Sequence, residues 1–152
     1  MECGVSVRLA RFPVIVVLTL IAQVSWAELA VVLVADSDSP VESISMLDIR
    51  KIYLGISVAV DGVKVRGIRW RNDERLDQIF LQSVIARSQR SYERRLLSMV
   101  LKYGTPRPAV ANDRDELMEL LAINPSSIAY MWKVDAEADS RVKIIRVLWQ
   151  ES

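Results

Sequence analysis

Histidine is absent from the 152-residue chain, and its single cysteine, Cys3, lies close to the N-terminus. The chain therefore has no histidine general base and no histidine-rich metal site, which excludes most hydrolytic triads. After residue 27 there is also no thiol that could act as a nucleophile, form a disulfide or bind a metal. No pair of carboxylates stands in a setting that indicates glycosidase or metal-hydrolase chemistry. The sequence predicts a protein that is not an enzyme and that uses no cofactor.

Net charge is nearly absent as well. The chain has 20 lysines and arginines against 19 aspartates and glutamates, a formal charge of +1. Arg8, Arg11 and Glu2 belong to the first 27 residues, so residues 28–152 carry no net charge. A neutral domain has no overall field that would attract nucleic acid or anionic lipid. We expect no nucleic-acid partner.

The first 27 residues have the pattern of a secretory signal peptide. Arg8 and Arg11 form a basic start, Phe12–Val24 is mostly aliphatic, and Ser25-Trp26-Ala27 places small residues at the usual cleavage positions. The apolar stretch is short for a membrane span. We expect cleavage after Ala27 and a periplasmic domain formed by residues 28–152, with an uncleaved membrane anchor as the alternative.

The start of this domain predicts a buried strand and a short capped helix. Leu29–Val34 is a continuous, β-branched apolar run, typical of a strand buried on both faces of a sheet. Ser45 is a good N-cap, and Asp48 stands three residues later as in a capping box. The helix should bury one face and end at a left-handed glycine; these residues are Ile49, Ile52, Tyr53 and Gly55.

A hairpin and a second helix are expected next. Asp61-Gly62 separates residues 56–60 from residues 63–68, a strong signal for a two-residue hairpin. The polar residues 69–73 then lead into a helix that Asn72 or Asp73 can cap. Its spacing predicts an inner face made of Leu76, Ile79, Phe80, Ser83 and Val84.

The rest of the chain predicts two more helices and two strands. One helix begins at Ser91, ends at Gly104 and turns Tyr92, Leu96, Leu97, Val100 and Leu101 inward. Asn112 caps the other, residues 113–123, whose inward residues are Leu117, Leu120 and Leu121. Ser127–Met131 and Val142–Leu148 read as strands separated by a solvated turn. The mixture predicts one α/β domain, a three-layer sandwich with a mixed sheet flanked by helices.

The loop before the second helix is the first candidate site. A helix N-terminus offers free amides and a favourable dipole to an anion, and arginines add charge-assisted contacts. The candidate ligand-binding residues here are Arg69, Arg71, Asn72, Asp73 and Arg75. A self-capped helix with a solvated charged loop is the alternative, because Asp73 and Glu74 already place two carboxylates at this helix start.

Two other groups of residues are candidates. The turns Asp36–Ser39 and Asn112–Asp115 stand at strand-to-helix junctions, where open α/β sheets bind ligands, so Ser37 and Ser39 could help the first loop. Ordinary turn chemistry explains the same residues. A basic cluster, which could dock an acidic protein partner or an anionic membrane, consists of Arg87, Arg90, Arg94 and Arg95. A solvated charged face is the alternative.

Several segments resemble periplasmic phosphate-binding proteins, the substrate receptors of phosphate ABC transporters. Residues 45–55, SMLDIRKIYLG, are similar to the Leu…Ile-Phe/Tyr-Leu-Gly helix of that family. The Asp61-Gly62 hairpin, the loop and helix of residues 69–80, and Gly104 follow in the same order. Residues 125–130, PSSIAY, are similar to the Pro-Gly-Ala-Ile-Gly-Tyr of the family. The resemblance covers roughly residues 29–131 and implies one lobe of a type 2 periplasmic-binding fold.

The resemblance leads to two functional hypotheses. In the family, an arginine and a Ser-Gly-Thr turn hold the anion between two lobes; here Asp73-Glu74-Arg75 stands in place of that turn. The first hypothesis is an exported substrate-binding lobe that binds phosphate or another small anion for envelope transport or sensing. Each added carboxylate repels a phosphate dianion. The second hypothesis is therefore a ligand-free interaction module whose partner is a membrane sensor or a transporter subunit.

Overall fold

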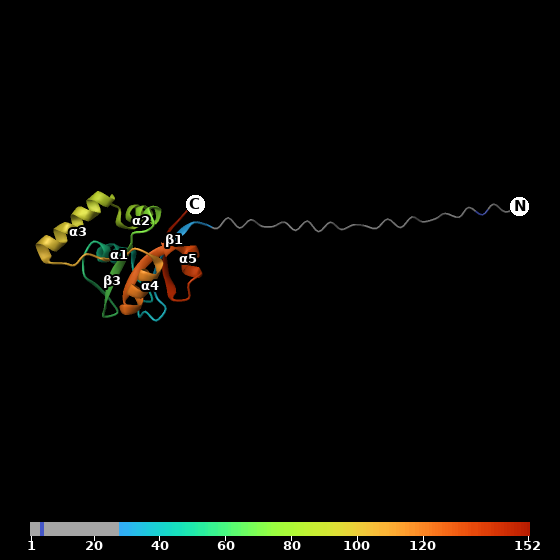
Figure 1. The fold of residues 1–152 in the computed structure, drawn as a ribbon, viewed down its shortest axis with the longest axis horizontal. Coiled ribbons are helices and arrows are strands. Elements are labelled where there is room, and N and C mark those ends of the chain that lie inside the picture. Colours follow the sequence, from blue (N-terminus) through green and yellow to red (C-terminus); the bar gives the residue numbers. More distant parts are fainter. Residues whose placement is uncertain (1–3, 5–27) are drawn as a thin grey trace.

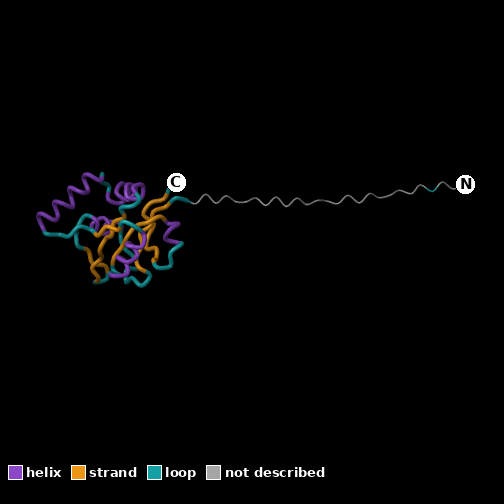
Figure 2. The backbone as a smooth tube through the Cα atoms, in the orientation of Figure 1, coloured by secondary structure: helices purple, strands orange, loops and turns teal. Residues whose placement is uncertain are grey.

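The computed structural model describes residue 4 and residues 28–152, so the predicted signal segment and its cleavage site lie outside the described residues. Six strands form one mixed sheet in the order β2-β3-β5-β1-β6, with β4 paired to β3 outside this path. Figures 1 and 2 show helices on both sides of it. The strands are β1 (Ala30–Asp36), β2 (Val58–Val60), β3 (Val63–Trp70), β4 (Ala109–Ala111), β5 (Ser127–Trp132) and β6 (Val142–Gln150).

The helices divide between the two faces of the sheet. They are α1 (Met46–Tyr53), α2 (Glu74–Phe80) with the π-helical turn η1 (Leu81–Ile85), α3 (Gln89–Tyr103), α4 (Arg114–Ile123) and α5 (Lys133–Glu137). Strand β1 supplies alternate residues to both faces: Leu33 packs with α1, α2 and α3, whereas Val34 packs with α4 and α5. The predicted three-layer sandwich is confirmed, and so is the burial of β1 on both sides. Among the described residues, no helix is long and apolar enough to cross a membrane.

Three local features predicted from the sequence are confirmed. The Ser45 hydroxyl accepts a hydrogen bond from the Asp48 amide at 3.0 Å and donates one to the Asp48 carboxylate at 2.8 Å. Asp61 and Gly62 both have positive φ, at 49° and 80°, as a type I′ hairpin turn requires. Gly104 ends α3 in the left-handed conformation. These features depend on a few neighbouring residues, which is why the sequence indicates them.

The prediction of which residues form the inner face of the second helix was partly wrong. Leu76, Phe80 and Val84 are buried as expected, but Ser83 is exposed and Leu81 and Ile85 are buried instead. The physical cause is η1, because a π-helical turn contains an extra residue and rotates the face that follows it. A regular 3.6-residue period does not predict this change.

Two predicted caps and two connections also need correction. Ser88, not Ser91, caps α3, and Asp113, not Asn112, caps α4. Residues 109–111 form the short strand β4, which the sequence analysis did not predict. The expected solvated turn before β6 instead begins with the short helix α5, which buries Ala136. Each error concerns a short element or a boundary, where pairing with distant residues decides the outcome.

The predicted inner face of α3 was wrong at two positions. Tyr92 and Leu96 are buried, and Met99 joins them, whereas Leu97 and Leu101 are 46% and 76% exposed. The helix packs through a narrow stripe, since residues 92, 96 and 99 follow a spacing of four and three. In Figure 1, α3 extends away from the sheet. Its outer face is therefore partly apolar and uncovered.

Gly67 in β3 makes room for a buried tyrosine. A Cβ atom at Gly67 would lie 2.8 Å from Cε1 and 2.9 Å from Cζ of Tyr53. The Tyr53 hydroxyl lies 3.0 Å from the carbonyl of Ile68 in β3 and 3.1 Å from that of Ile128 in β5. Tyr53 thus joins helix α1 to two strands, and glycine allows its ring to reach them.

We predict that Gly67→Ala lowers the free energy of unfolding by about 1–3 kcal/mol, because the added methyl group overpacks a closed core. Chemical denaturation of the single and double variants checks the cause. If the Tyr53 ring is the obstacle, Gly67→Ala should cost much less in a Tyr53→Leu background. Equal costs in both backgrounds would contradict this explanation.

Candidate functional site

The centre of the candidate site is Arg69, near the end of β3. Successive side chains of a strand point to opposite faces, so Arg69 shares its face with Val65 and Gly67. That face is the one covered by α1, α2 and α3. Arg69 is only 9% exposed. A charged group in this position must find partners within the protein.

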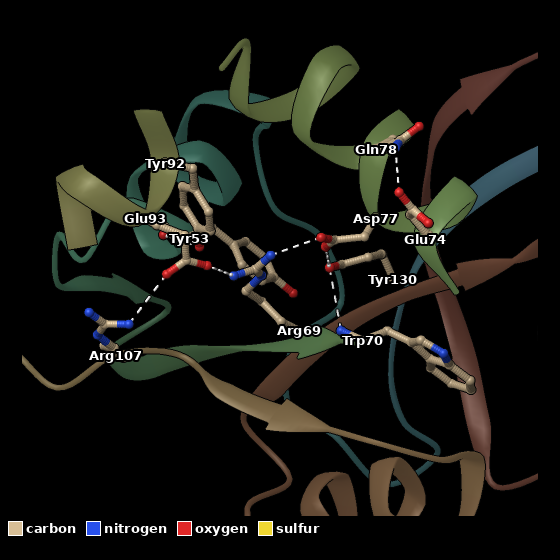
Figure 3. Close-up of polar contacts among 10 residues, drawn as sticks. All are labelled: Tyr53, Arg69, Trp70, Glu74, Asp77, Gln78, Tyr92, Glu93, Arg107 and Tyr130. Carbon is tan, nitrogen blue, oxygen red and sulfur yellow. Dashed lines mark hydrogen bonds and ion pairs between the residues drawn. The ribbon is translucent and has the colours of Figure 1, made fainter. Parts of the chain in front are cut away.

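Two carboxylates from two helices hold the Arg69 guanidinium. Nη2 donates to Oδ2 of Asp77 in α2, and Nη1 donates to Oε1 of Glu93 in α3, both at 2.8 Å (Figure 3). The guanidinium carbon also lies 4.7 Å from the centre of the Tyr92 ring. Both terminal nitrogens of Arg69 are therefore bonded to acidic side chains.

Each of these carboxylates has a further donor. Oδ1 of Asp77 accepts a hydrogen bond from the Tyr130 hydroxyl at 2.5 Å, and Oε2 of Glu93 accepts one from Nη1 of Arg107 at 3.3 Å. The Tyr130 oxygen in turn lies 3.4 Å from the Trp70 amide nitrogen. Two guanidinium groups thus face two carboxylates, so the cluster has no surplus positive charge for an external anion.

The protonation states in this cluster follow from its burial and charges. Burial alone lowers the pKa of Arg69, but the charge of Asp77 and the hydrogen bond to Glu93 outweigh it and raise the pKa. Burial, reinforced by the charge of Asp77, raises the pKa of the Tyr130 hydroxyl well above its usual value. Arg69 stays charged, and Tyr130 stays protonated as a donor to Asp77.

The start of α2 is satisfied by the protein itself. Oδ1 of Asp73 accepts a hydrogen bond from the Leu76 amide at 2.9 Å, and Oδ2 accepts one from the indole of Trp132 at 2.6 Å. Arg75 lies over the Trp132 ring, 5.9 Å from its centre. The Asp73 carboxylate occupies the place at the helix start where an anion was expected to bind.

The predicted ligand-binding residues are not all brought together. Arg71 and Asn72 are exposed beside the Arg69 cluster, and the Arg71 amide donates to Ala111 at 3.0 Å. The turn that follows β4 at Asn112 therefore lies next to this loop, as expected. The binding roles assigned to these residues stay predictions.

The expected help from Ser37 and Ser39 is not supported by the topology. Ile128 of β5 lies level with both Ala35 and Gly67, but β1 is antiparallel to β5 whereas β3 is parallel to it. The chain therefore leaves β1 at the opposite end of the sheet from Arg69. The Ser39 hydroxyl also accepts a hydrogen bond from the Val41 amide at 3.2 Å. The expectation of a shared cleft assumed parallel strands, and this sheet is mixed.

Sequence reasoning missed Asp77, Glu93 and Tyr130 as partners of Arg69. One signal was available. The alternation of β3 places Arg69 on the buried face with Val65, and a buried arginine requires acidic partners. Asp77 follows Asp73 by one helical turn and is a natural choice. Glu93, on a separate helix, could not be identified without the tertiary fold.

The four arginines of the predicted partner surface do not form one face. Arg90 and Arg94 are exposed on the outside of α3, and neither makes an ion pair within the described part of the chain. Arg87 precedes the helix and donates to the Ser91 hydroxyl at 3.2 Å. Arg95 is turned partly inward, and its Nε is buried without a partner among the described residues. Only part of the cluster is available for docking.

Solved structures with a similar fold include three phosphate-binding proteins. An ABC-type phosphate transport receptor from Vibrio cholerae has a TM-score of 0.56 and 16% identity, and the match covers 78% of this chain and 46% of that one. A putative phosphate ABC transporter substrate-binding protein with bound phosphate from Clostridium perfringens has a TM-score of 0.57 and 14% identity, and the match covers 78% of this chain and 44% of that one. PstS from Borrelia burgdorferi has a TM-score of 0.54 and 17% identity, and the match covers 79% of this chain and 47% of that one.

This chain has the fold of one lobe of such a binding protein. It spans less than half the length of each of these three proteins. No protein-family model matches the sequence, and no curated protein matches it. The resemblance to phosphate-binding proteins is confirmed at the level of structure. At 14–17% identity it concerns the fold alone.

We predict that Arg69→Met lowers the free energy of unfolding by about 3 kcal/mol, because it leaves Asp77 without its cation in a largely buried position. Adding Asp77→Asn should recover part of this loss by removing the uncompensated charge. Arg71→Met, on the exposed neighbouring loop, is the matched control and should have little effect. Urea denaturation of the four proteins measures the differences, and a neutral Arg69→Met would contradict the structural role.

Proposed function

We propose that this chain is an exported binding-protein lobe that acts as a protein-interaction module in envelope transport or sensing and does not capture phosphate. The observation that supports this most strongly is the state of Arg69. Its two terminal nitrogens are bonded to Asp77 and Glu93 at 2.8 Å, so the protein's own carboxylates stand where an oxyanion would bind.

The surroundings of Arg69 also disfavour an anion. The Asp73 carboxylate is bonded to the first turn of α2 and to Trp132, and Glu74 adds another negative charge there. A phosphate dianion would have to displace these contacts and overcome the repulsion. Both effects reduce affinity.

The outer face of α3 is the surface we assign to a partner. Arg90, Arg94, Leu97 and Leu101 follow one another at spacings of four, three and four, so they share one side of the helix. Leu101 and the neighbouring Tyr103 are 76% and 72% exposed. Exposed apolar side chains beside unpaired cations are typical of an interaction surface. The fitting partner is a protein surface that is acidic at one end and apolar at the other.

Export and the kind of partner follow from two further arguments. The leader pattern of residues 1–27 favours secretion. The structures with this fold are described as receptors or substrate-binding proteins of phosphate transport. We therefore propose a partner in the cell envelope, either a transporter subunit or a membrane sensor.

We predict that calorimetric titration with millimolar phosphate gives no binding heat for the folded protein, because Asp77 and Glu93 already neutralise Arg69. Asp77→Asn combined with Glu93→Gln frees the guanidinium and should introduce weak phosphate binding that falls as salt is added. Stoichiometric micromolar binding to the unaltered protein would contradict the proposal.

We predict that a photo-crosslinker at Leu97 or Leu101 captures an envelope protein, and that Arg90→Glu with Arg94→Glu abolishes the crosslink. Arg71→Glu with Arg75→Glu changes the charge equally at another place and serves as the control, which should keep the crosslink. Loss of the crosslink in the control as well would show that net charge is responsible. If the protein binds anionic vesicles and gives no protein crosslink, the surface contacts a membrane and the proposed protein partner is wrong.

A further inference from the structure

A groove of about 650 Å³ lies beside the first part of β3 and borders the Arg69 cluster at Arg107. Residues of β3 form its floor, and its walls come from the ends of α1, α3 and α4, the segment after α3 and the start of β5. Small-molecule sites in proteins commonly have volumes of about 300–1,000 Å³. The groove is thus large enough for a small organic ligand.

The topology of the sheet explains why the groove exists. Strand β2 pairs with residues 63–65 of β3, and β4 pairs with residues 68–70. The Arg71 amide donates to the Ala111 carbonyl of β4, whereas the preceding amide, that of Trp70, faces the side-chain hydroxyl of Tyr130 from β5. Successive amides of a strand point to opposite edges, so β4 lies on the edge of β3 away from β5. Strand β2 also lies on the edge of β3 away from β5, because β3 stands between β2 and β5 in the sheet. Residues 66 and 67 stand between the two pairings, and the groove opens there.

The walls of the groove are mainly apolar and strongly exposed. Ile56, Tyr103 and Ile123 line it and are 41%, 72% and 80% exposed. Ile52 and Leu120 lie deeper. Large apolar side chains gathered around a concave surface indicate a binding site more strongly than the same residues scattered over the molecule.

All the charged residues that line the groove are cations. They are Lys64, Arg66 and Arg107, and no aspartate or glutamate is among the lining residues. Arg107 already bonds to Glu93, but neither Lys64 nor Arg66 makes an ion pair with an acidic group of the described chain. Lys64 and Arg66 are two residues apart on β3, so their side chains leave the same face about 7 Å apart. Their repulsion would be relieved by one anion placed between them.

We propose that this groove binds an amphipathic organic anion, with an apolar body against Ile123 and Leu120 and a single carboxylate or similar head group between Lys64 and Arg66. The face of β3 that carries Lys64 and Arg66 also carries Ile68, which packs with the core residues of α4. Head group and apolar body can therefore be held on one side of the sheet. Its head-group residues Lys64 and Arg66 are distinct from Arg69 and from the arginines of α3, although Tyr103 and Arg107 at its rim border those surfaces, so the inference does not depend on the proposed function.

Dansyl-undecanoic acid is a suitable probe, since its fluorescence rises on entering an apolar site and its carboxylate supplies the head group. We expect saturable binding to the full chain and displacement by dodecanoate. The methyl ester of dodecanoate lacks the charge and should displace the probe about tenfold less effectively. Lys64→Gln with Arg66→Gln should weaken probe binding by about tenfold or more, since about 1.4 kcal/mol is tenfold in affinity.

Two further variants separate a built site from general adsorption. Ile123→Glu places a negative charge on an exposed position of the wall, so it should fold normally and greatly reduce binding. Arg71→Gln with Arg75→Gln removes two cations at the other end of the sheet and should leave binding unchanged. Equal binding by all variants, or by acid and ester, would overturn the proposal. So would absence of saturable binding, or binding of the protein only to anionic vesicles.

Discussion

The burial of one guanidinium controls how the helices sit on this sheet. Arg69 lies at the end of β3 on the face that packs against α1, α2 and α3, and its two partners come from α2 and α3. A buried cation without such partners would cost several kcal/mol. The two helices must therefore keep positions from which Asp77 and Glu93 both reach it. Tyr92 adds its ring to one side of the same group, and Tyr130 fixes the second oxygen of Asp77.

The internal bonding of Arg69 also explains why a shared fold does not imply a shared ligand. The solved proteins with this fold include a phosphate transport receptor and a putative substrate-binding protein with bound phosphate. In this chain the buried Arg69 is bonded to internal carboxylates, and Asp73 caps the start of α2. A lobe can keep its core and lose the chemistry of its site, because packing depends on shape and apolar area whereas anion binding depends on a few free donors.

The sequence allowed the local features and the general architecture to be predicted. The Ser45 cap, the Asp61-Gly62 hairpin and the end of α3 at Gly104 depend on residues within one turn of each other. The π-helical turn at Leu81–Ile85 could not be predicted, because the register of a helix changes there to suit the packing around it. Glu93 was missed for a similar reason, since it meets Arg69 only after α3 folds back. Ser37 and Ser39 were expected beside Arg69 but lie at the opposite end of the sheet, because strand direction in a mixed sheet is set by distant pairings.

The two ends of β3 differ in their electrostatics, and this difference bears on where an anion would go. At the end near Trp70, the acidic groups Asp73, Glu74, Asp77 and Glu93 are matched by the cations Arg69, Arg71, Arg75 and Arg107. At the other end, Lys64 and Arg66 stand without acidic partners in the described chain, beside apolar walls. The net charge of residues 28–152 is zero, so a small anion is guided by these local differences and not by an overall field. Such an anion would gain little at the end near Trp70, where the charges balance, and would be attracted by the unpaired Lys64 and Arg66 at the opposite end. We therefore assign the proposed anion site to the free cations of β3 and not to its buried arginine.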